Sequence, residues 1–215
     1  MSSRIINGDS TKELKKFKDN SIDAVICDPP YGIEFLAKEW DSNTGAVEIW
    51  QECLRVLKPG GHLLAFSAAR TYHILATNIQ ASGFEIRDQI MWLYASGFPK
   101  AQDIGRAIER RKGNTRSVEL HSNGTSPYCP ICKKYTITRC DKCPPEPVNE
   151  WSGWKTALKP AHEPICMARK PMKGSTIDNV QKHGVGALNI DATRIGERFP
   201  SNVLGEVEGY QKFFY

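Results

Sequence analysis

Blocks of apolar and polar positions along the chain predict strands and helices in alternation. An apolar run over 22–27 predicts a buried strand, which ends at two prolines that cannot donate hydrogen bonds to a neighbouring strand. Apolar residues every three or four positions over 46–57 predict an amphipathic helix that ends near a glycine pair. Further strands are predicted over 62–67 and 84–94, on either side of a helix over 70–83. This order predicts an α/β fold built on a parallel sheet with crossover helices.

The pattern changes in the second half of the chain. A helix is predicted over 101–113, but residues 114–150 are polar, rich in Pro and Cys, and have no sustained period. Apolar sequence returns in a strand predicted over 164–168. We therefore expect one main domain, in which residues 1–113 and 151–215 form the core and its continuation and residues 114–150 form an inserted subdomain.

Composition indicates a soluble globular protein. Hydrophobic residues make up 40% of the 215 residues and charged residues 25%, and no apolar run approaches the length of a membrane helix. The first ten residues lack the basic and apolar regions of a secretory signal, so we expect a cytoplasmic location. The seven cysteines then favour metal binding or free thiols over disulfides.

Positive charge is concentrated in one part of the chain. The formal net charge is +5, whereas residues 96–145 alone carry ten Lys or Arg against four acidic residues. A basic segment of this kind is typical of nucleic-acid binding, although a solvated basic surface has the same composition.

The residues after the first predicted strand are candidates for catalysis. Ligands in open α/β sheets bind beyond the carboxyl ends of strands, where Asp28 must lie. Its carboxylate and the main-chain carbonyl of Pro29 can accept the two hydrogens of an exocyclic amine and draw its lone pair out of conjugation with a base. Pro30 stiffens the backbone, and the Tyr31 ring can stack on the base. The alternative is that Asp28 is a turn aspartate.

Other polar residues allow two interpretations. Asp9 could cap a short helix or contribute to a binding site. Gly32 could let the chain pass close to a ligand or relax the turn. His162 and Glu163 begin the returning strand, and we expect them to be structural or pocket-edge residues rather than an acid and a base.

These residues, taken in order, resemble a known family. The segments "NSIDAVICDPPYG", "LRVLKPGGHLLAF", "MWLYASGFPKA", "LKPAHEPICMARKP" and "GALNIDATRI" are similar to the phage and prophage branch of the amino-methylating DNA methyltransferases, in which the catalytic motif comes first. The resemblance implies a Rossmann-like fold and methyl transfer from S-adenosylmethionine to a flipped base in double-stranded DNA. The target is adenine N6 or cytosine N4, and Asp28 in the first place of the motif favours adenine. It further implies that Asp9 and Asp28 help to hold the cofactor.

The resemblance covers only part of the family pattern. Relatives carry a glycine-rich "FxGxG" turn for the methionine end of the cofactor, and these 215 residues contain no such motif. We therefore expect a partial methyltransferase sheet, completed by a further segment or by a second chain. The alternative is a truncated, catalytically inactive DNA-binding protein.

Four cysteines in the insertion predict a metal site. They form two C-x2-C pairs separated by seven residues, a pattern typical of structural zinc sites. The predicted zinc ligands are Cys129, Cys132, Cys140 and Cys143. In the family this region faces nucleic acid, so the candidate phosphate contacts are Lys133, Lys134, Arg139 and Lys142. The other three cysteines lie on core-like elements and are expected to pack as small hydrophobic residues.

Overall fold

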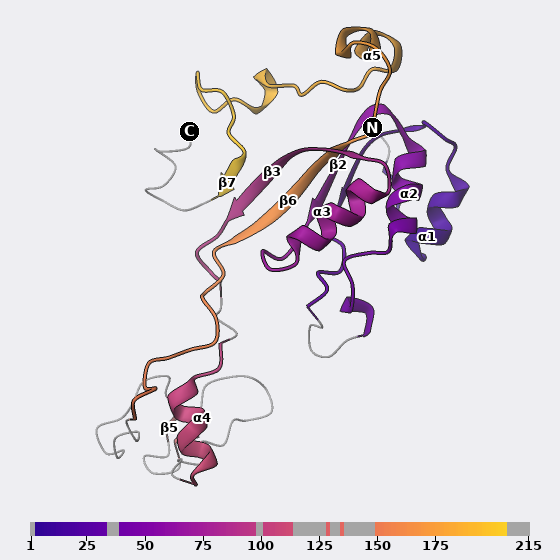
Figure 1. Ribbon diagram of the computed structural model, residues 1–215. Helices are drawn as coiled ribbons and strands as arrows, with labels where there is room; N and C mark the ends of the chain where they lie inside the picture. The colour runs from indigo at the N-terminus through magenta and orange to yellow at the C-terminus, as the bar shows by residue number, and fades with distance from the viewer. Residues whose placement is uncertain are drawn as a thin grey trace. The chain divides into compact units, whose positions relative to one another are not determined.

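The computed structural model of the chain describes residues 3–33, 39–97, 101–113, 128–129, 134–135 and 149–205 (Figure 1). The chain divides into two compact units. Unit 1 consists of Met1–Ser96 and Ala161–Tyr215, and unit 2 consists of Gly97–Pro160. Unit 2 is therefore wider than the insertion predicted from the sequence, because it includes the helix before residue 113 and the segment after residue 150.

Unit 1 is built on a five-stranded sheet in the order β1-β2-β6-β3-β7. The strands are β1 (Ile22–Cys27), β2 (Leu57–Phe66), β6 (His162–Arg169), β3 (Glu85–Leu93) and β7 (Val203–Gly205). β1 is parallel to β2 and β3 is parallel to β7, whereas β6 is antiparallel to both of its neighbours. The carboxyl ends of β1, β2 and β3 therefore lie at one edge of the sheet, together with the start of β6.

The three strands predicted in the first half of the chain, β1, β2 and β3, run in the same direction, but the returning strand β6 lies antiparallel between β2 and β3, because the chain leaves and re-enters unit 1 at the same edge. The N–H of Tyr94, directly after β3, donates a hydrogen bond to the carbonyl of Ala161, directly before β6, at 3.0 Å. A connection that begins and ends at one edge returns in the opposite direction, which makes β3 and β6 an antiparallel pair despite the 64 residues of unit 2 between them.

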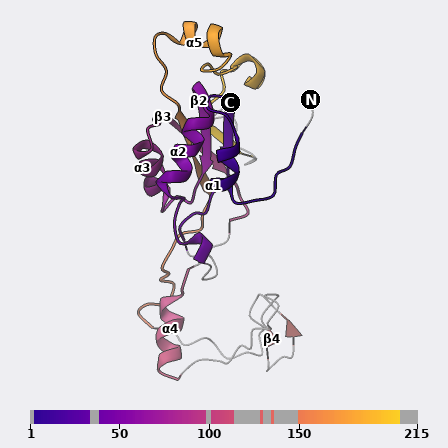
Figure 2. The ribbon, with the colours of Figure 1, turned by 90° about the vertical axis from the view of Figure 1, so that its right-hand side faces the viewer.

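Helices α2 (Val47–Val56) and α3 (Tyr72–Ala81) cover one face of this sheet (Figures 1 and 2). Both helices were predicted from their apolar spacing. The buried core between the helices and the sheet consists of Trp50, Cys53, Leu57, Leu63, Ala65, Leu75, Ile79, Phe84, Cys166 and Ala168. Two of the three cysteines expected to pack as hydrophobic residues are thus fully buried in the core, and Cys27 is half-buried against it.

β2 begins earlier than predicted. The glycine pair expected to end the preceding helix lies inside the strand, where the pairing register with β1 shifts between Ile22 and Ala24. Gly60 adopts a φ of +80°, a left-handed conformation that glycine tolerates without strain. An irregular strand start therefore replaces the predicted turn.

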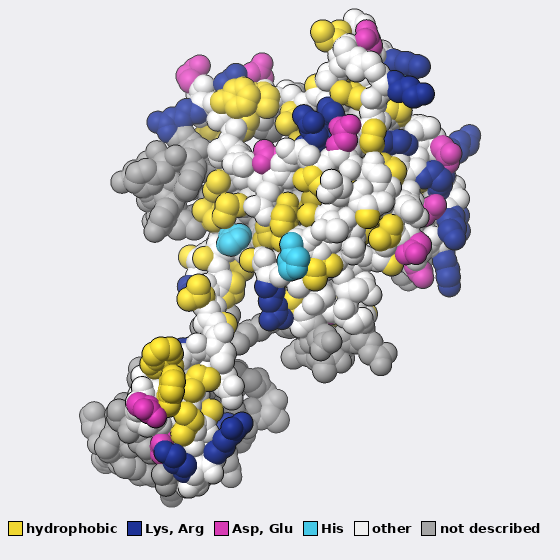
Figure 3. Space-filling view, viewed as in Figure 1, with side chains coloured by type: hydrophobic (Ala, Val, Ile, Leu, Met, Phe, Trp, Pro, Cys, Tyr) yellow, Lys and Arg dark blue, Asp and Glu magenta, His cyan; other side chains and the backbone are white. Residues whose placement is uncertain are grey.

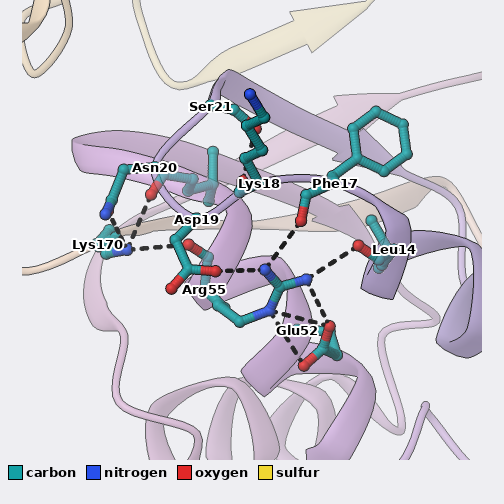
Figure 4. Close-up of polar contacts among 10 residues, drawn as sticks. Leu14, Phe17, Lys18, Asp19, Asn20, Ser21, Glu52, Arg55 and Lys170 are labelled. Atoms are coloured by element: carbon teal, nitrogen blue, oxygen red, sulfur yellow. Dashed lines mark hydrogen bonds and ion pairs between the residues drawn. The ribbon is translucent and has the colours of Figure 1, made fainter.

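A network around Arg55 fastens the N-terminal segment to α2 (Figure 4). This segment contains α1 (Ser10–Glu13) and the 3₁₀ helix η1 (Leu14–Lys16). The Arg55 guanidinium donates to the carbonyls of Phe17 (2.9 Å) and Leu14 (3.0 Å) and also bonds two carboxylates, those of Asp19 and Glu52. One planar cation thus satisfies both backbone and side-chain acceptors.

After β6 the chain forms α5 (Thr176–His183), which was not predicted. Ser175 caps this helix by accepting a hydrogen bond from the N–H of Asp178, three residues later. Buried Asn179 donates to the carbonyls of Pro59 (2.9 Å) and Val185 (2.8 Å) and so ties α5 to the start of β2. The chain then runs through η4 (Asp191–Thr193) to β7.

Unit 2 contains α4 (Ile104–Arg111), which packs against the segment that follows residue 148. Asn149 donates from its amide to the Gly105 carbonyl at 3.1 Å and to the buried carboxylate of Glu109 at 2.8 Å. These contacts explain why α4 belongs to unit 2 and not to the sheet domain.

Two short strands complete the described part of unit 2: β4 (Tyr128–Cys129) pairs antiparallel with β5 (Lys134–Tyr135). Across the described residues of the whole chain, no helix has the length and apolar character needed to cross a membrane.

Candidate functional site

The predicted catalytic residues lie where the sequence placed them, in the turn that leaves β1. Strand alternation puts the two residues at the junction in opposite environments, with Cys27 turned towards the core and Asp28 exposed to solvent. Burial raises the pKa of the Cys27 thiol to about 12, so this thiol stays neutral. Pro29, Pro30 and Tyr31 are each half-buried. The exposed carboxylate is therefore available to a ligand beyond the sheet edge.

A buried carboxylate holds this turn from the other side. Asp41 belongs to η3 (Glu39–Asp41), and its side chain is almost completely buried. Its Oδ1 accepts hydrogen bonds from the N–H of Tyr31 at 2.7 Å and from the N–H of Gly32 at 3.1 Å. Because one buried oxygen accepts two backbone hydrogen bonds, Asp41 fixes the backbone that carries Asp28 and Tyr31.

Gly32 has a structural reason to be glycine. Its φ is +65°, in the left-handed region, and a Cβ at this position would meet Thr44 Cγ2 at 3.2 Å. This observation favours the second of the two interpretations of Gly32, in which glycine relaxes the turn.

The hydroxyl of Tyr31 lies among carboxylates. It donates to Glu163 Oε2 at 3.2 Å, a contact that joins the turn after β1 to the first residues of β6. Burial raises the pKa of the Tyr31 phenol above its ordinary value, and hydrogen bonding with Asp28 and the charge of Glu163 raise the pKa further. Tyr31 is thus a neutral hydrogen-bond donor, and Glu163 accepts its hydrogen bond.

Further aromatic rings lie near this edge of the sheet. Phe66 at the end of β2 packs edge-to-face on Trp92 of β3, with ring centroids 5.8 Å apart, and Trp92 packs in the same way on Tyr94 at 6.4 Å. Burial and the nearby Glu163 raise the pKa of Tyr94. Trp92 remains 44% exposed, which leaves an aromatic surface next to the returning strand.

Asp9 acts as a helix cap, one of its two predicted roles. Its side chain accepts a hydrogen bond from the N–H of Thr11 at 2.9 Å and another from the Thr11 hydroxyl. These bonds lower the pKa of Asp9. The carboxylate lies at the surface, so its role towards the cofactor stays a prediction.

The predicted zinc and DNA residues fall largely outside the described part of the chain. Cys132, Cys140, Cys143, Lys133, Arg139 and Lys142 are not among the described residues, and only the backbone of Cys129 and Lys134 is described. That backbone pairs Cys129 with Lys134 across β4 and β5. Among the described residues there is no group of three or more potential metal ligands. Both sets of residues therefore remain predictions.

Sequence reasoning missed the role of Asp41 and the partner of Glu163. Asp41 precedes "SNTG", which is typical of a plain turn, and it accepts a hydrogen bond from the N–H of Tyr31, ten residues earlier in the chain. Glu163 is 132 residues away from Tyr31 along the chain. Neither contact leaves a signal in a single sequence.

Comparison with known proteins identifies the family. A family model for N6 and N4 methyltransferases, described as DNA methylase, matches residues 22–202. The chain belongs to this DNA methylase family. The match includes the turn after β1, the aromatic edge and the returning strand.

This DNA methylase has several curated relatives. It is 30% identical to the Type II methyltransferase M.HindIII of Haemophilus influenzae, in an alignment that covers 86% of this chain and 64% of the relative. It is 31% identical to the DNA adenine methyltransferase YhdJ of Escherichia coli K12, over 49% of this chain and 38% of the relative. The PvuII DNA methyltransferase, whose solved structure is described as cytosine-N4-specific, is 15% identical with a TM-score of 0.47, over 93% of this chain and 55% of that chain. The methylase thus spans two thirds or less of the length of these relatives.

Proposed function

We propose that this chain forms the amine-binding site of a DNA methyltransferase that transfers a methyl group from S-adenosylmethionine to the exocyclic N6 of adenine. The observation that carries this proposal is the exposed Asp28 carboxylate at the end of β1, on a turn whose backbone is fixed by buried Asp41. Preorganised acceptors of this kind contribute most where charge develops during the reaction.

The chemistry follows from the acceptors. An adenine amine is a poor nucleophile, because its lone pair is delocalised into the ring. The Asp28 carboxylate and the Pro29 carbonyl would accept its two hydrogens and localise the lone pair on nitrogen. S-adenosylmethionine would supply the methyl group to this nitrogen, and the Asp28 carboxylate or solvent would accept the proton that the nitrogen loses. Tyr31 would stack on the base, which must leave the duplex to reach this edge.

S-adenosylmethionine supplies an electrophilic methyl group when it is bound. The described residues fit one part of this cofactor, its adenosine. Surface-exposed Asp9 offers an acceptor of the kind that hydroxyl and amino groups of an adenosine require. Asp28 would lie beside the methyl donor. The sequence contains no glycine-rich turn of the "FxGxG" type for the methionine end, so we assign no residues to that end.

Adenine is favoured over cytosine by two observations. The first residue of the catalytic motif is aspartate, which resembles the adenine branch of the family, and one relative is itself described as a DNA adenine methyltransferase. Cytosine N4 is the alternative, since an N4-methylating enzyme needs the same two acceptors.

Expression in cells that lack both modified bases tests this function. We expect the genomic DNA to acquire N6-methyladenine, measured by mass spectrometry of nucleosides, and the Asp28→Ala variant to reduce it at least a hundredfold, a loss typical of a catalytic group. Asp23→Ala, an exposed aspartate of the same strand, is the matched control. N4-methylcytosine instead would correct the target, and full activity of Asp28→Ala would contradict the mechanism.

We also propose that Cys129, Cys132, Cys140 and Cys143 bind a structural zinc ion. The spacing of the pairs and the hairpin that begins at Cys129 support this proposal. Elemental analysis of protein purified under reducing conditions should give about one zinc per chain, and Cys132→Ser with Cys143→Ser should remove it. Cys27→Ala should retain zinc. A metal-free native protein would contradict the proposal.

A further inference from the structure

The Tyr31 hydroxyl has two acceptors within reach but only one proton to donate. It donates to Glu163 Oε2 at 3.2 Å, and the nearby Asp28 carboxylate is among the groups that raise the pKa of the phenol. This second neighbour matters for the proposed function, because Asp28 is the carboxylate that would receive the target amine. A phenol bonded to Asp28 occupies a lone pair that the amine requires.

We propose that Glu163 is a positioning residue that accepts the Tyr31 hydroxyl and thereby leaves the Asp28 carboxylate to the target amine. This role rests on the proposed function. In this role Glu163, at the start of β6, keeps the Asp28 carboxylate at the end of β1 free of the Tyr31 hydroxyl.

Glu163 is well placed for this role because it lies on a strand that is paired with its neighbours. β6 lies between β2 and β3, and Glu163 pairs in register with Trp92 of β3. The next residue, Pro164, is completely buried and accepts a hydrogen bond from the Ser67 N–H at 3.0 Å. The carboxylate therefore projects from a fixed strand, whereas the partner it holds, Tyr31, belongs to a turn.

The ionisable groups near the Tyr31 hydroxyl come from three different elements of the sheet. Asp28 comes from the end of β1, Glu163 from β6, and the phenol of Tyr94, which Glu163 also influences, from the residue after β3. Because the hydroxyl has one proton, it can donate to only one of the two carboxylates at a time, and it donates to Glu163.

A double-mutant cycle tests the role. Glu163→Leu removes the acceptor, so the hydroxyl falls back on Asp28, and we expect KM for DNA to rise about tenfold, the effect of losing one bond to a charged group. In the Tyr31→Phe background no hydroxyl competes, and Glu163→Leu should then change KM less than about twofold. Glu163→Gln retains an acceptor oxygen and should lose less than Glu163→Leu, whereas Glu48→Leu, an exposed glutamate of α2, should have no effect. Equal losses in both backgrounds would overturn the role, since Glu163 would then act only through stability.

A second measurement tests the contact without any activity. The Cζ chemical shift of ¹³C-labelled Tyr31 at neutral pH reports its phenol hydrogen bond, and Tyr31→Phe assigns the signal. We expect Glu163→Leu to move the signals of Tyr31 and Tyr94, and Glu48→Leu to move neither. An unmoved Tyr31 signal would overturn the inference. A wild-type protein that methylates no DNA would contradict the proposed function and with it this role, while the chemical shift would still show whether the contact exists.

Discussion

At the scale of single residues, two aspartates at the edge of the sheet have opposite tasks. Asp28 is exposed, whereas Asp41 is 2% exposed and accepts hydrogen bonds from the backbone N–H groups of Tyr31 and Gly32. A buried carboxylate is tolerated only when its lone pairs are satisfied, and a catalytic carboxylate must keep one free. The turn therefore contains one aspartate that supports the backbone and one exposed aspartate that, in the proposed function, accepts the target amine.

Truncation of the structural aspartate should loosen the turn. Asp41→Ala leaves two backbone N–H groups without their acceptor, and we expect a loss of about 1–3 kcal/mol in the free energy of unfolding, measured with urea. Asp41→Asn keeps an acceptor oxygen and should lose less. Methyl transfer should fall in the same order, because the position of Asp28 depends on this backbone. Equal stability of Asp41→Ala and wild type would show that the two bonds contribute nothing.

At the scale of elements, periodicity located most strands and helices but not their arrangement. β1, β3 and β6 were predicted because each is an apolar run next to a turn signal, and with β1 came the place of Asp28 and Tyr31. The reversed direction of β6 could not be predicted, because it depends on where unit 2 leaves and re-enters the sheet. α5 was missed although Ser175 and Asp178 have the spacing of a capping box. Contacts such as Asp41 with Tyr31 exist only after the elements have packed.

The N-terminal segment shows how one side chain can hold an element. Arg55 of α2 bonds the carbonyls of Leu14 and Phe17 through its fork of N–H donors. Arg55→Lys keeps the charge but cannot reach all these acceptors, and Arg55→Ala removes them all. We therefore expect the urea midpoint to fall from wild type to Arg55→Lys to Arg55→Ala.

Hydrogen exchange can show where this loss occurs. In both Arg55 variants the amides of 14–21 should exchange faster, while those of β6 change less. Lys16→Ala, which removes only an exposed ion pair with Glu13, is the control and should leave the midpoint close to that of wild type. Uniformly faster exchange across unit 1 would contradict a local role for Arg55.

At the scale of the whole molecule, charge is divided between the two units. Unit 2 carries 12 Lys or Arg against six acidic residues, a net charge of +6, whereas the whole chain has +5. Unit 1 is therefore close to neutral. Figure 3 shows basic side chains of unit 2, at the lower left, beside a group of hydrophobic ones. Trp151 and Trp154 pack edge-to-face at 5.3 Å and remain 40% and 61% exposed. Basic and aromatic groups together are typical of nucleic-acid surfaces.

Removal of unit 2 should leave unit 1 folded but weaken its binding to DNA. Because Tyr94 and Ala161 are hydrogen-bonded neighbours, a short glycine-containing turn in place of residues 97–160 can join β3 to β6 directly. We expect this variant to unfold cooperatively, since the described core of unit 1 includes no residue of unit 2. Its affinity for duplex DNA should fall, and the dependence of log K on log salt should flatten, because each lost phosphate contact removes about 0.9 from the slope.

A variant with four substitutions tests DNA binding by unit 2 more specifically. Replacing Lys133, Lys134, Arg139 and Lys142 with alanine should flatten the salt dependence by up to about 3.6 if all four contact phosphates. The matched control replaces four lysines of the N-terminal segment, Lys12, Lys15, Lys16 and Lys18. A slope that depends on total charge alone would change equally in both variants, and this result would contradict a specific interface in unit 2. A change confined to the first variant would place the phosphate contacts in unit 2. The target base would then bind separately, at the turn after β1.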